Sequence, residues 1–548
     1  MTNDATSVHR TTRPPWWFWA ALAVCWYSLI SVRPLLEPDE GRYAEIPREM
    51  WTSGDWVTPR LSGLKYFEKP PLQYWATAAV YSGFGVSEFT SRVFSATMAF
   101  LCLPLVYLFA VRMFGSTTIG STAVLLLATN PVFVVIGQIN LLDSAFAFFI
   151  SATVFSLLLA CSARRGSAPE RNWAMLMWTA LALAMLTKGV AAVVLTGLAL
   201  IAYSIATRDL EPWRRLHWPS GLLLFSVIGA PWFVLVTRRN PEFLQFFFVH
   251  EHLARFFTSI HARTGPWWYF VPLLVLAMLP WFKSFAPALH DATTRAPHSP
   301  NPRTNRVLWI WCAVVTVFFS ISQSKLVPYI LPVMPALAVA LAQRVTADPL
   351  RFRKAAYWLV ALVACAAIAV LIEPLRSGAK IPANAISPAV AAVIVAMVAA
   401  VAMTRIRLTE NIQRFGPAIA AASVLTWSLL LVSYSYAKPT RTAKALVASV
   451  RDHVGPTTQI FSVGQYRQTI APYLGRTLHV VGYSGELAFG QSQQRSTRES
   501  GLETFLQQWP ERSDAIAFID PQLYRKLGAA RLPGAVLASD DASIVLQR

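Results

Sequence analysis

The sequence predicts a mainly helical, polytopic membrane protein that ends in a small soluble α/β domain. Three observations predict this fold class. First, 55% of the 548 residues are hydrophobic and only 14% are charged, which lies outside the composition usual for soluble domains. Second, apolar runs of roughly 20 residues, the length needed to cross a bilayer, recur as far as about residue 436. Third, short β-like runs alternate with helical patterns after that point.

Thirteen apolar runs are candidates for membrane-spanning helices. They are 16–33, 92–113, 117–138, 144–162, 173–187, 189–206, 219–237, 267–287, 307–322, 326–343, 356–373, 387–404 and 416–435. A further run, 71–84, is short and begins beside Pro70, and we interpret it as an interfacial or re-entrant segment. The first run is too long and too Trp-rich at its start for a cleavable signal peptide, so we interpret it as an anchor. We therefore expect about thirteen transmembrane helices.

The placement of basic residues predicts the topology. The formal net charge is +20. An excess of basic residues of this size can serve to bind nucleic acid or anionic lipid, or it can reflect basic cytoplasmic loops. If the N-terminus is cytoplasmic and 71–84 does not cross, the Arg-rich short loops between spans all fall in the cytoplasm, as the positive-inside rule requires. We therefore expect no nucleic-acid partner and an outer C-terminus. The transmembrane domain is assigned to 1–436, with a first outer loop at 34–91, and the soluble domain to 437–548.

The C-terminal segment has the pattern of an α/β domain of ordinary size. The β-like runs are 458–464, 477–483 and 515–520, and the helical patterns are 442–454, 501–509 and 521–529. No Gly-rich phosphate loop follows any of these strands, so the sequence does not support nucleotide binding. We interpret the domain as a structural or partner-binding cap. All five cysteines of the chain lie in apolar runs, so neither a disulfide framework nor a Cys-based metal site is expected.

Charged residues on the predicted outer face require an explanation other than the positive-inside rule. The basic members are Arg42, Arg48, Arg60, Lys65, Lys69, Arg238, Arg239, Arg255, Arg263 and Lys325. As a set they favour an anionic substrate at the outer membrane surface, the alternative being solvated loop charge or contact with lipid phosphates. Two carboxylates, Asp39 and Asp143, stand at outer helix ends and suit chemistry on a lipid-linked substrate. The alternative role for Asp143 is to cap the following helix.

At these residues the sequence resembles a known family. The first-loop segments "EPDEGRYAEIPREM", "GDWVTPRLSG" and "YFEKPPLQYW" resemble membrane glycosyltransferases of the C superfamily (GT-C), most closely the lipid A 4-amino-4-deoxy-L-arabinose transferases. They are more distantly similar to protein O-mannosyltransferases. The resemblance extends through Asp143, "LTKG" around Lys188 and "SQSKLVPYILP" with Lys325 and Tyr329, but no motif in the C-terminal domain adds to it. It implies a GT-C type fold with interfacial helices in the first loop.

The resemblance also implies an activity and its residues. The activity is inverting transfer of an aminopentose from undecaprenyl phosphate to a lipid A phosphate on the periplasmic side of the bacterial inner membrane, which lowers the negative charge of lipid A and confers polymyxin resistance. Asp39 matches the family's catalytic carboxylate, which would act as a general base or else by orienting the acceptor and stabilising positive charge on the sugar ring. Asp143 is the second catalytic candidate. Four residues match the family's substrate-phosphate loop: Arg42, Tyr43, Tyr66 and Lys69. Further substrate-binding candidates are Glu68, Arg255, Lys325 and Tyr329. Among these, acids such as Glu68 or Asp143 would select the sugar ammonium by charge.

We expect no metal or other cofactor. The implied donor is a phosphate diester with one negative charge, which basic side chains can neutralise alone. A divalent ion shared by Glu68 and His250 stays open as an alternative. The partners implied are the donor lipid, lipid A and membrane lipids, and we expect a monomer.

Two other functions stay open. One is a polyprenyl-phosphate-sugar transferase that acts on a protein hydroxyl or on another glycolipid. The other, less favoured, is a lipid or sugar transporter, because transporters place ionisable residues near the bilayer midplane and most spans here have uncharged interiors. Lys188 is the main exception.

Overall fold

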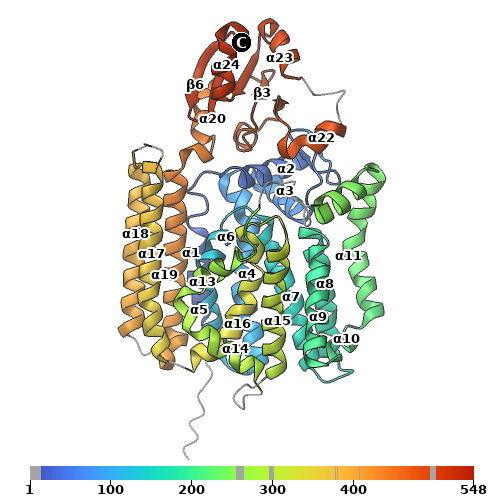
Figure 1. Ribbon diagram of the computed structural model, residues 1–548, viewed down its shortest axis with the longest axis vertical. Helices are drawn as coiled ribbons and strands as arrows, with labels where there is room; N and C mark the ends of the chain where they lie inside the picture. The colour runs from blue at the N-terminus through green and yellow to red at the C-terminus, as the bar shows by residue number, and fades with distance from the viewer. Residues whose placement is uncertain are drawn as a thin grey trace, which may run out of the picture.

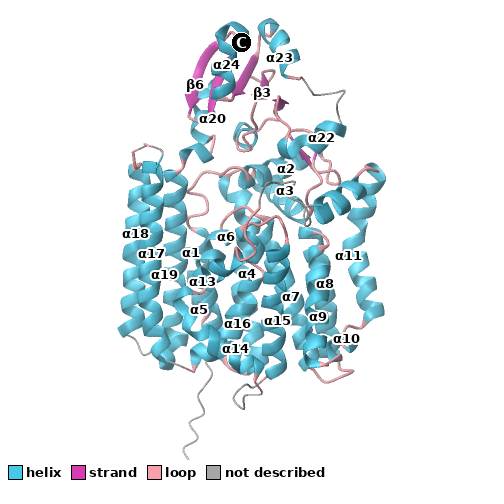
Figure 2. Cartoon of the chain, in the orientation of Figure 1, coloured by secondary structure: helices cyan, strands magenta, loops and turns pink. Residues whose placement is uncertain are grey.

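The computed structural model describes residues 14–254, 264–294, 301–347, 349–376, 378, 380–405, 408–493 and 501–548. Figure 1 shows a bundle of long helices with the C-terminal domain seated on one end. In Figure 2 the larger sheet lies in that domain, and the bundle below it is helical. The predicted fold class, mainly α with a terminal α/β domain, is confirmed.

Each predicted apolar run coincides with helix in the structure. The helices of the bundle are α1 (Trp16–Tyr27), α4 (Glu88–Phe114), α5 (Thr117–Ala128), α6 (Pro131–Gly137), α7 (Leu142–Ser162), α8 (Ala168–Lys188), α9 (Ala191–Thr207), α10 (Glu211–Arg214), α11 (Trp218–Arg239), α13 (Phe270–Ala277), η2 (Leu279–Ser284), α14 (Phe285–Thr293), α15 (Pro302–Ile321), η3 (Val327–Ile330), α16 (Val333–Thr346), α17 (Pro349–Arg376), α18 (Ala383–Arg405) and α19 (Leu408–Ala437). A helix is the expected form for such runs, because it satisfies every backbone polar group within the segment.

The chain is a multi-span membrane protein. Within the described residues, seven helices are long and apolar enough to cross a membrane, and up to nine spans result if each of two bent pairs counts as one. The bent pairs are α5 with α6, at 70°, and α13 with η2 and α14, at 87°. Asn130 explains the first break, because its side chain accepts the Phe133 N–H at 2.9 Å and so caps the start of α6. The count of thirteen spans stays a prediction.

The helices surround a buried centre. Of the most apolar stretch of α7, 89% of the residues are buried against the rest of the protein. The corresponding value for α11 is only 22%. Phe109 of α4 stacks on Phe155 of α7 with ring centroids 4.1 Å apart. The helices α17, α18 and α19 pack together at one side of the bundle (Figure 1). The central α7 therefore offers a rigid platform at whose first turn Asp143 lies.

The first loop forms two short helices rather than irregular chain. They are α2 (Asp39–Ser53) and α3 (Leu72–Phe84), and both lie under the C-terminal domain in Figure 1. The 13 residues of α3 are too few to cross a bilayer, in agreement with an interfacial segment at 71–84. Between them the strands β1 (Arg60–Leu61) and β2 (Leu64–Lys65) form a hairpin, whose turn places Ser62 and Gly63 at φ 54° and 73°.

The C-terminal domain is built on a mixed five-stranded sheet in the order β4-β3-β5-β7-β6. The strands are β3 (Gln459–Val463), β4 (His479–Val481), β5 (Ala515–Ile519), β6 (Ala535–Asp540) and β7 (Ser543–Gln547), and the helices are η4 (Pro439–Arg441), α20 (Lys444–Val450), η5 (Arg451–His453), α21 (Ile470–Leu474), η6 (Gly485–Leu487), α22 (Ala488–Gln493), α23 (Leu502–Gln508), η7 (Trp509–Glu511) and α24 (Pro521–Arg531). The three predicted strands correspond to β3, β4 and β5. Sequence reasoning missed β6 and β7. The edge strand β6 is largely exposed and lacks the alternation that a half-buried strand shows.

Candidate active site

The opening acids of the first loop lie in the first turn of α2. Asp39 and Glu40 are favourably placed there, since the N-terminal end of a helix carries partial positive charge. The helix ends at Gly54, whose φ of 70° is the left-handed conformation that glycine adopts without strain. Most of α2 is buried between the bundle and the C-terminal domain. The first loop is therefore a fixed part of the structure.

Glu40 fastens the start of α2 to the bundle. Its carboxylate accepts two hydrogen bonds from Arg33, at 2.7 and 3.0 Å, and two from Arg92 of α4, at 2.7 and 2.9 Å. It also accepts the backbone N–H of Asn140, at 3.0 Å, just before α7 begins. Burial alone would raise the pKa of Glu40, but the two guanidinium groups hold it well below its usual range. Glu40 thus fixes Asp39 relative to Asp143.

A cavity of about 350 Å³ opens beside α2, at the end of the bundle that carries the C-terminal domain. Its lining includes seven of the ten predicted site residues, namely Asp39, Arg42, Tyr43, Glu68, Lys69, Asp143 and Tyr329. Tyr66 lies behind this wall, with its ring 6.0 Å from the guanidinium carbon of Arg42. Lys325 lies between the lining residues Ser324 and Leu326. Arg255 falls outside the described residues.

Arg42 is the buried cation of the cavity. Its guanidinium donates to Asp39 at 3.2 Å and lies 5.8 Å from the ring centroid of Tyr43. It also forms an ion pair with Glu486, a residue of the C-terminal domain. The Asp39 side chain is 41% exposed, whereas that of Arg42 is 6% exposed. A substrate entering from solvent therefore meets Asp39 before it reaches Arg42.

The aromatic residues around Arg42 stay neutral. Burial raises the pKa of Tyr43 and that of Tyr66 well above the usual phenol range, although Arg42 opposes the shift. Their hydroxyls are therefore hydrogen-bond donors at physiological pH, and their rings flank the guanidinium. A phosphate in the cavity would meet the Arg42 cation beside the neutral side chain of Tyr43, with Tyr66 behind the guanidinium.

Asp143 forms an ion pair with Lys188, the last residue of α8. The cap of α7 is Leu141, which makes no side-chain cap bond, so the alternative that Asp143 caps this helix is wrong. The Lys188 ammonium lies 4.5 Å from the ring centroid of Tyr329 and 5.3 Å from that of Phe146. Lys188 belongs to the "LTKG" segment, and sequence reasoning missed it as a site residue. The structure adds it to the cavity.

Two further basic residues, Lys69 and Lys325, lie at or beside the cavity. Lys69 donates to the backbone carbonyl of Glu68 at 2.8 Å and lies 3.9 Å from the carboxylate of Glu251. Glu251 belongs to the π-helical segment η1 (Gln245–Ala254) and also lines the cavity. Lys325 donates to the Ser322 carbonyl at 2.6 Å, and burial lowers the pKa of its ammonium.

Metal ligands do not gather at this site in the part of the chain that the structure describes. No group of three or more His, Cys, Asp or Glu side chains is arranged to hold an ion there. His250 lies 3.3 Å from Glu251, and the pair supplies at most two ligands. The arrangement of acids and bases at the cavity suits charge-assisted binding of a phosphate.

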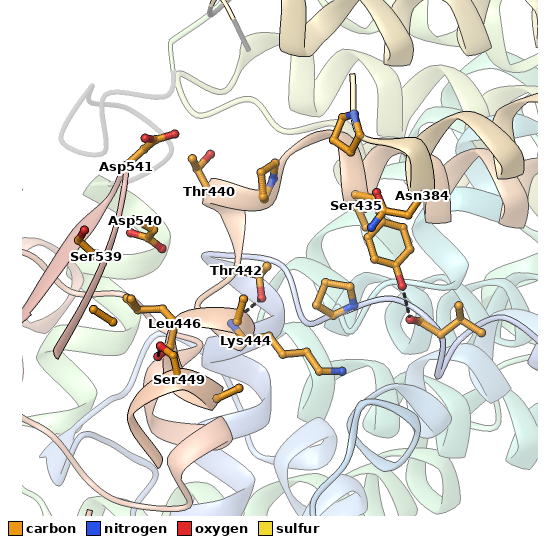
Figure 3. Close-up of a pocket in the computed structure, with 18 residues that line it drawn as sticks. Asn384, Ser435, Thr440, Thr442, Lys444, Leu446, Ser449, Ser539, Asp540 and Asp541 are labelled. Atoms are coloured by element: carbon orange, nitrogen blue, oxygen red, sulfur yellow. Dashed lines mark hydrogen bonds between the residues drawn. The ribbon is translucent and has the colours of Figure 1, made fainter. Parts of the chain in front are cut away.

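A larger cavity, of about 810 Å³, lies where α18 and α19 meet the C-terminal domain (Figure 3). Its labelled polar residues are Asn384, Ser435, Thr440, Thr442, Lys444, Ser449, Ser539, Asp540 and Asp541. None of the ten predicted site residues is among the described residues that line it. The Lys444 ammonium pairs with Glu88 at 2.6 Å, and Asp540 pairs with Arg467 at 2.8 Å. This cavity lacks the predicted carboxylates and cations, which gather at the smaller cavity.

Glu49 of α2 predicts a pH dependence of stability. Burial and the neighbouring Glu45 raise its pKa to about 8, against the opposing Gly63 N–H and Arg48. Between pH 4.5 and 8 the folded protein keeps the Glu49 proton, whereas the unfolded chain, with a carboxyl pKa near 4.5, has released it. The free energy of unfolding therefore falls as pH rises through this range, by up to about 1.4 kcal/mol per pH unit. The Glu49→Gln variant should lose this slope and melt higher than wild type at pH 8.5. Melting curves at pH 5.5 and 8.5 check this, and equal slopes in both proteins would contradict it.

Two family models match separate parts of the chain. Residues 16–247 match the model described as dolichyl-phosphate-mannose-protein mannosyltransferase. Residues 446–548 match the aminoarabinose transferase C-terminal domain. The second match adds a resemblance in the domain where the sequence analysis found no motif.

Curated relatives and a solved structure are similar to the chain. The undecaprenyl phosphate-alpha-4-amino-4-deoxy-L-arabinose arabinosyl transferase 1 of Proteus mirabilis is 30% identical over 61% of this chain, and its counterpart from Pseudomonas paraeruginosa is 34% identical over 61%. These matches span 60% and 62% of the relatives' own length. The crystal structure of ArnT from Cupriavidus metallidurans bound to undecaprenyl phosphate is 33% identical, with a TM-score of 0.85 and 97% of each chain covered.

Proposed function

Because the chain belongs to the family of undecaprenyl phosphate-aminoarabinose arabinosyltransferases, we propose that it transfers 4-amino-4-deoxy-L-arabinose from undecaprenyl phosphate to a phosphate of lipid A. The observation that carries the proposal is the single cavity that unites Asp39 and Asp143 with the cations Arg42, Lys69 and Lys188. A lipid-phosphate donor needs fixed positive charge at its leaving group and a carboxylate at the acceptor side. This cavity supplies both.

The proposed reaction is a direct displacement with inversion. An oxygen of the acceptor phosphate attacks the anomeric carbon of the sugar, and the bond from that carbon to the undecaprenyl phosphate oxygen breaks. The electron pair of that bond leaves with undecaprenyl phosphate, whose negative charge grows as the bond breaks. Arg42 and Lys69 would stabilise this charge more in the transition state than in the ground state, which is the condition for catalysis.

Asp39 is the proposed general base. A phosphate monoester has its second pKa near ~6, so at neutral pH most of the acceptor is already deprotonated. Asp39 would take the last proton from the remaining monoanion, and it would also orient the acceptor oxygen and stabilise positive charge on the sugar ring. The exposed position of Asp39 suits an acceptor that arrives from outside the cavity. Asp143, paired with Lys188 deeper in the cavity, would orient the donor.

Glu68 is the proposed partner of the sugar ammonium, next to Lys69, which would contact the donor phosphate. Glu68→Gln should reduce the preference for the aminopentose donor over a neutral pentose donor by about tenfold, because a charge-assisted contact is replaced by a neutral one. Competition between the two donors, with products separated by mass, measures the preference. An unchanged ratio in the variant would contradict this role.

We propose that the site faces the periplasm, with the chain in the bacterial inner membrane and its N-terminus in the cytoplasm. The support is the distribution of Lys and Arg, which the positive-inside rule reads as a cytoplasmic N-terminal side. The cavity and the C-terminal domain then lie together on the opposite side, where lipid A would be accessible. Adding an aminosugar there would lower the negative charge of lipid A and with it the attraction of polymyxin. We propose that the chain acts as a monomer.

Transfer is proposed to need no metal ion. The donor phosphate carries one negative charge, and cationic side chains at the cavity can neutralise it directly. Protein treated with EDTA should keep its turnover, and added Mg²⁺ or Mn²⁺ should not raise it. A loss of activity on chelation that Mg²⁺ restores would contradict this expectation.

Mass spectrometry of lipid A tests the proposed function. The chain is expressed in a Gram-negative strain that lacks its own aminoarabinose transferase, and lipid A should gain an aminopentose. If lipid A is unchanged although the protein reaches the membrane, the acceptor assignment fails. Peptides or another glycolipid carrying the added sugar in the same cells would then support the alternative function, a transferase with a different acceptor.

A further inference from the structure

We infer that the C-terminal domain positions Arg42, a residue of the catalytic cavity, and that it does so through Glu486. The inference rests on the proposed transferase function and deepens it, because it gives the soluble domain a part in the same site. The sequence interpretation of that domain was a structural or partner-binding cap. Its contacts with the first loop point to a more direct role.

One segment of the domain, residues 466–486, lies along the first loop. We call it the docking segment. On one side of Asp39, Glu37 accepts hydrogen bonds from Thr469 and from Arg467, the latter at 3.2 Å. On the other side, Arg48 donates to the carbonyl of Gly475 at 3.1 Å. Asp39 is therefore held between two attachments to the same domain.

The docking segment and α2 approach each other closely at Gly41. A Cβ atom at this position would lie 2.5 Å from the backbone carbonyl carbon of Gln468, so only glycine fits without displacing the docking segment. The next residue of α2 is Arg42, whose side chain meets Glu486. Backbone contact and ion pair thus occur on the same turn of helix.

Glu486 is held for this contact. Its second carboxylate oxygen accepts the side-chain N–H of Gln468 at 2.6 Å, and the side chain is 11% exposed. Breaking a buried ion pair leaves an uncompensated charge, so Arg42 and Glu486 depend on each other. Among the ion pairs of the described residues, Arg42 has two carboxylate partners, Asp39 and Glu486.

Two carboxylates on opposite sides of one guanidinium have a chemical consequence. Glu486 shares the charge of Arg42, so Asp39 is not fully neutralised by it and can act on the acceptor. The same sharing limits how strongly Arg42 holds the lipid phosphate that leaves after transfer. Glu486 would therefore weaken the binding of undecaprenyl phosphate and so speed its release after transfer. Turnover rises when release of this product contributes to the rate. This makes it a positioning residue, since it acts through Arg42.

The test is a double-mutant cycle read by binding of undecaprenyl phosphate to the full-length protein. Glu486→Gln keeps the shape of the side chain and removes its charge. We expect it to lower the Kd of undecaprenyl phosphate about threefold when Arg42 is present, and to leave the Kd unchanged in an Arg42→Gln background. In the transfer assay the same substitution should lower kcat about tenfold. Damage to the fold would instead weaken binding and turnover together.

Glu503→Gln is the matched control, because Glu503 lies in the same domain and pairs with Arg531 on an exposed surface. It should leave Kd and kcat as in wild type. The inference is overturned if Glu486→Gln leaves the Kd unchanged or raises it, or if its effect is the same without Arg42. If wild type binds undecaprenyl phosphate but transfers no aminopentose, the proposed function fails while the binding cycle still decides the role of Glu486. Failure of wild type to bind undecaprenyl phosphate overturns both.

Discussion

Asp39→Asn is expected to abolish aminopentose transfer while leaving donor binding measurable. The amide carries no negative charge, so it can neither accept a proton from the acceptor nor stabilise positive charge on the sugar ring. Loss of a general base typically costs about 10²–10⁴-fold in rate, which is the range expected here. Arg42 and Lys69, which would contact the donor phosphate, remain in place in the variant. Transfer is measured by mass spectrometry of lipid A, and binding by titration with undecaprenyl phosphate.

Asp55→Asn serves as the control for this prediction. Asp55 belongs to the same loop, accepts the backbone N–H groups of Val57 and Thr58 at 3.1 Å, and does not line the catalytic cavity. Its variant should keep most of the activity. Turnover like that of wild type in the Asp39 variant would end the claim that Asp39 is catalytic.

Glu40→Ala is expected to be the most destabilising single substitution in the first loop. Its carboxylate compensates two buried guanidinium groups, those of Arg33 and Arg92, whose side chains are 1% and 0% exposed. Removing one partner from a buried ionic cluster typically costs about 3–5 kcal/mol. The substitution also removes the acceptor of the Asn140 N–H, which holds the segment before α7. Thermal unfolding of the purified protein in detergent measures the loss.

Glu88→Gln gives the comparison for an ion pair nearer solvent. Glu88 pairs with Lys444, whose side chain is 49% exposed, and such pairs contribute under about 1 kcal/mol. Its melting temperature should fall far less than that of Glu40→Ala. Similar melting temperatures for the two variants would show that the Arg33–Glu40–Arg92 cluster does not fasten the first loop.

The helical bundle was predictable from sequence because a bilayer admits few alternatives. An apolar run of about 20 residues must satisfy its backbone internally, so runs such as 92–113 and 144–162 could only be helices. Breaks inside a run were not visible in this way. The bend after α5 depends on a side-chain cap by Asn130, which composition does not reveal. The edge strand β6 was missed for a similar reason, since its exposure removes the alternating pattern.

The site was predictable where its residues lie within one motif and not where they come from distant segments. The first-loop resemblance named Asp39, Arg42 and Lys69, and all three line one cavity. Glu486 gave no signal, because it is an isolated acid in the short helix η6 of another domain and approaches Arg42 only in the folded chain. Lys188 stood in a quoted segment, but its pairing with Asp143 depends on how α7 and α8 pack.

The most direct test of the central claim is reconstitution of the purified full-length protein in vesicles with aminoarabinose-linked undecaprenyl phosphate and lipid A. The account predicts that wild type converts lipid A to a species heavier by one aminopentose and releases undecaprenyl phosphate in equal amount. The Asp39→Asn protein, which still binds undecaprenyl phosphate, should form neither product. Unmodified lipid A with wild type, in vesicles where donor binding is verified, would contradict the account.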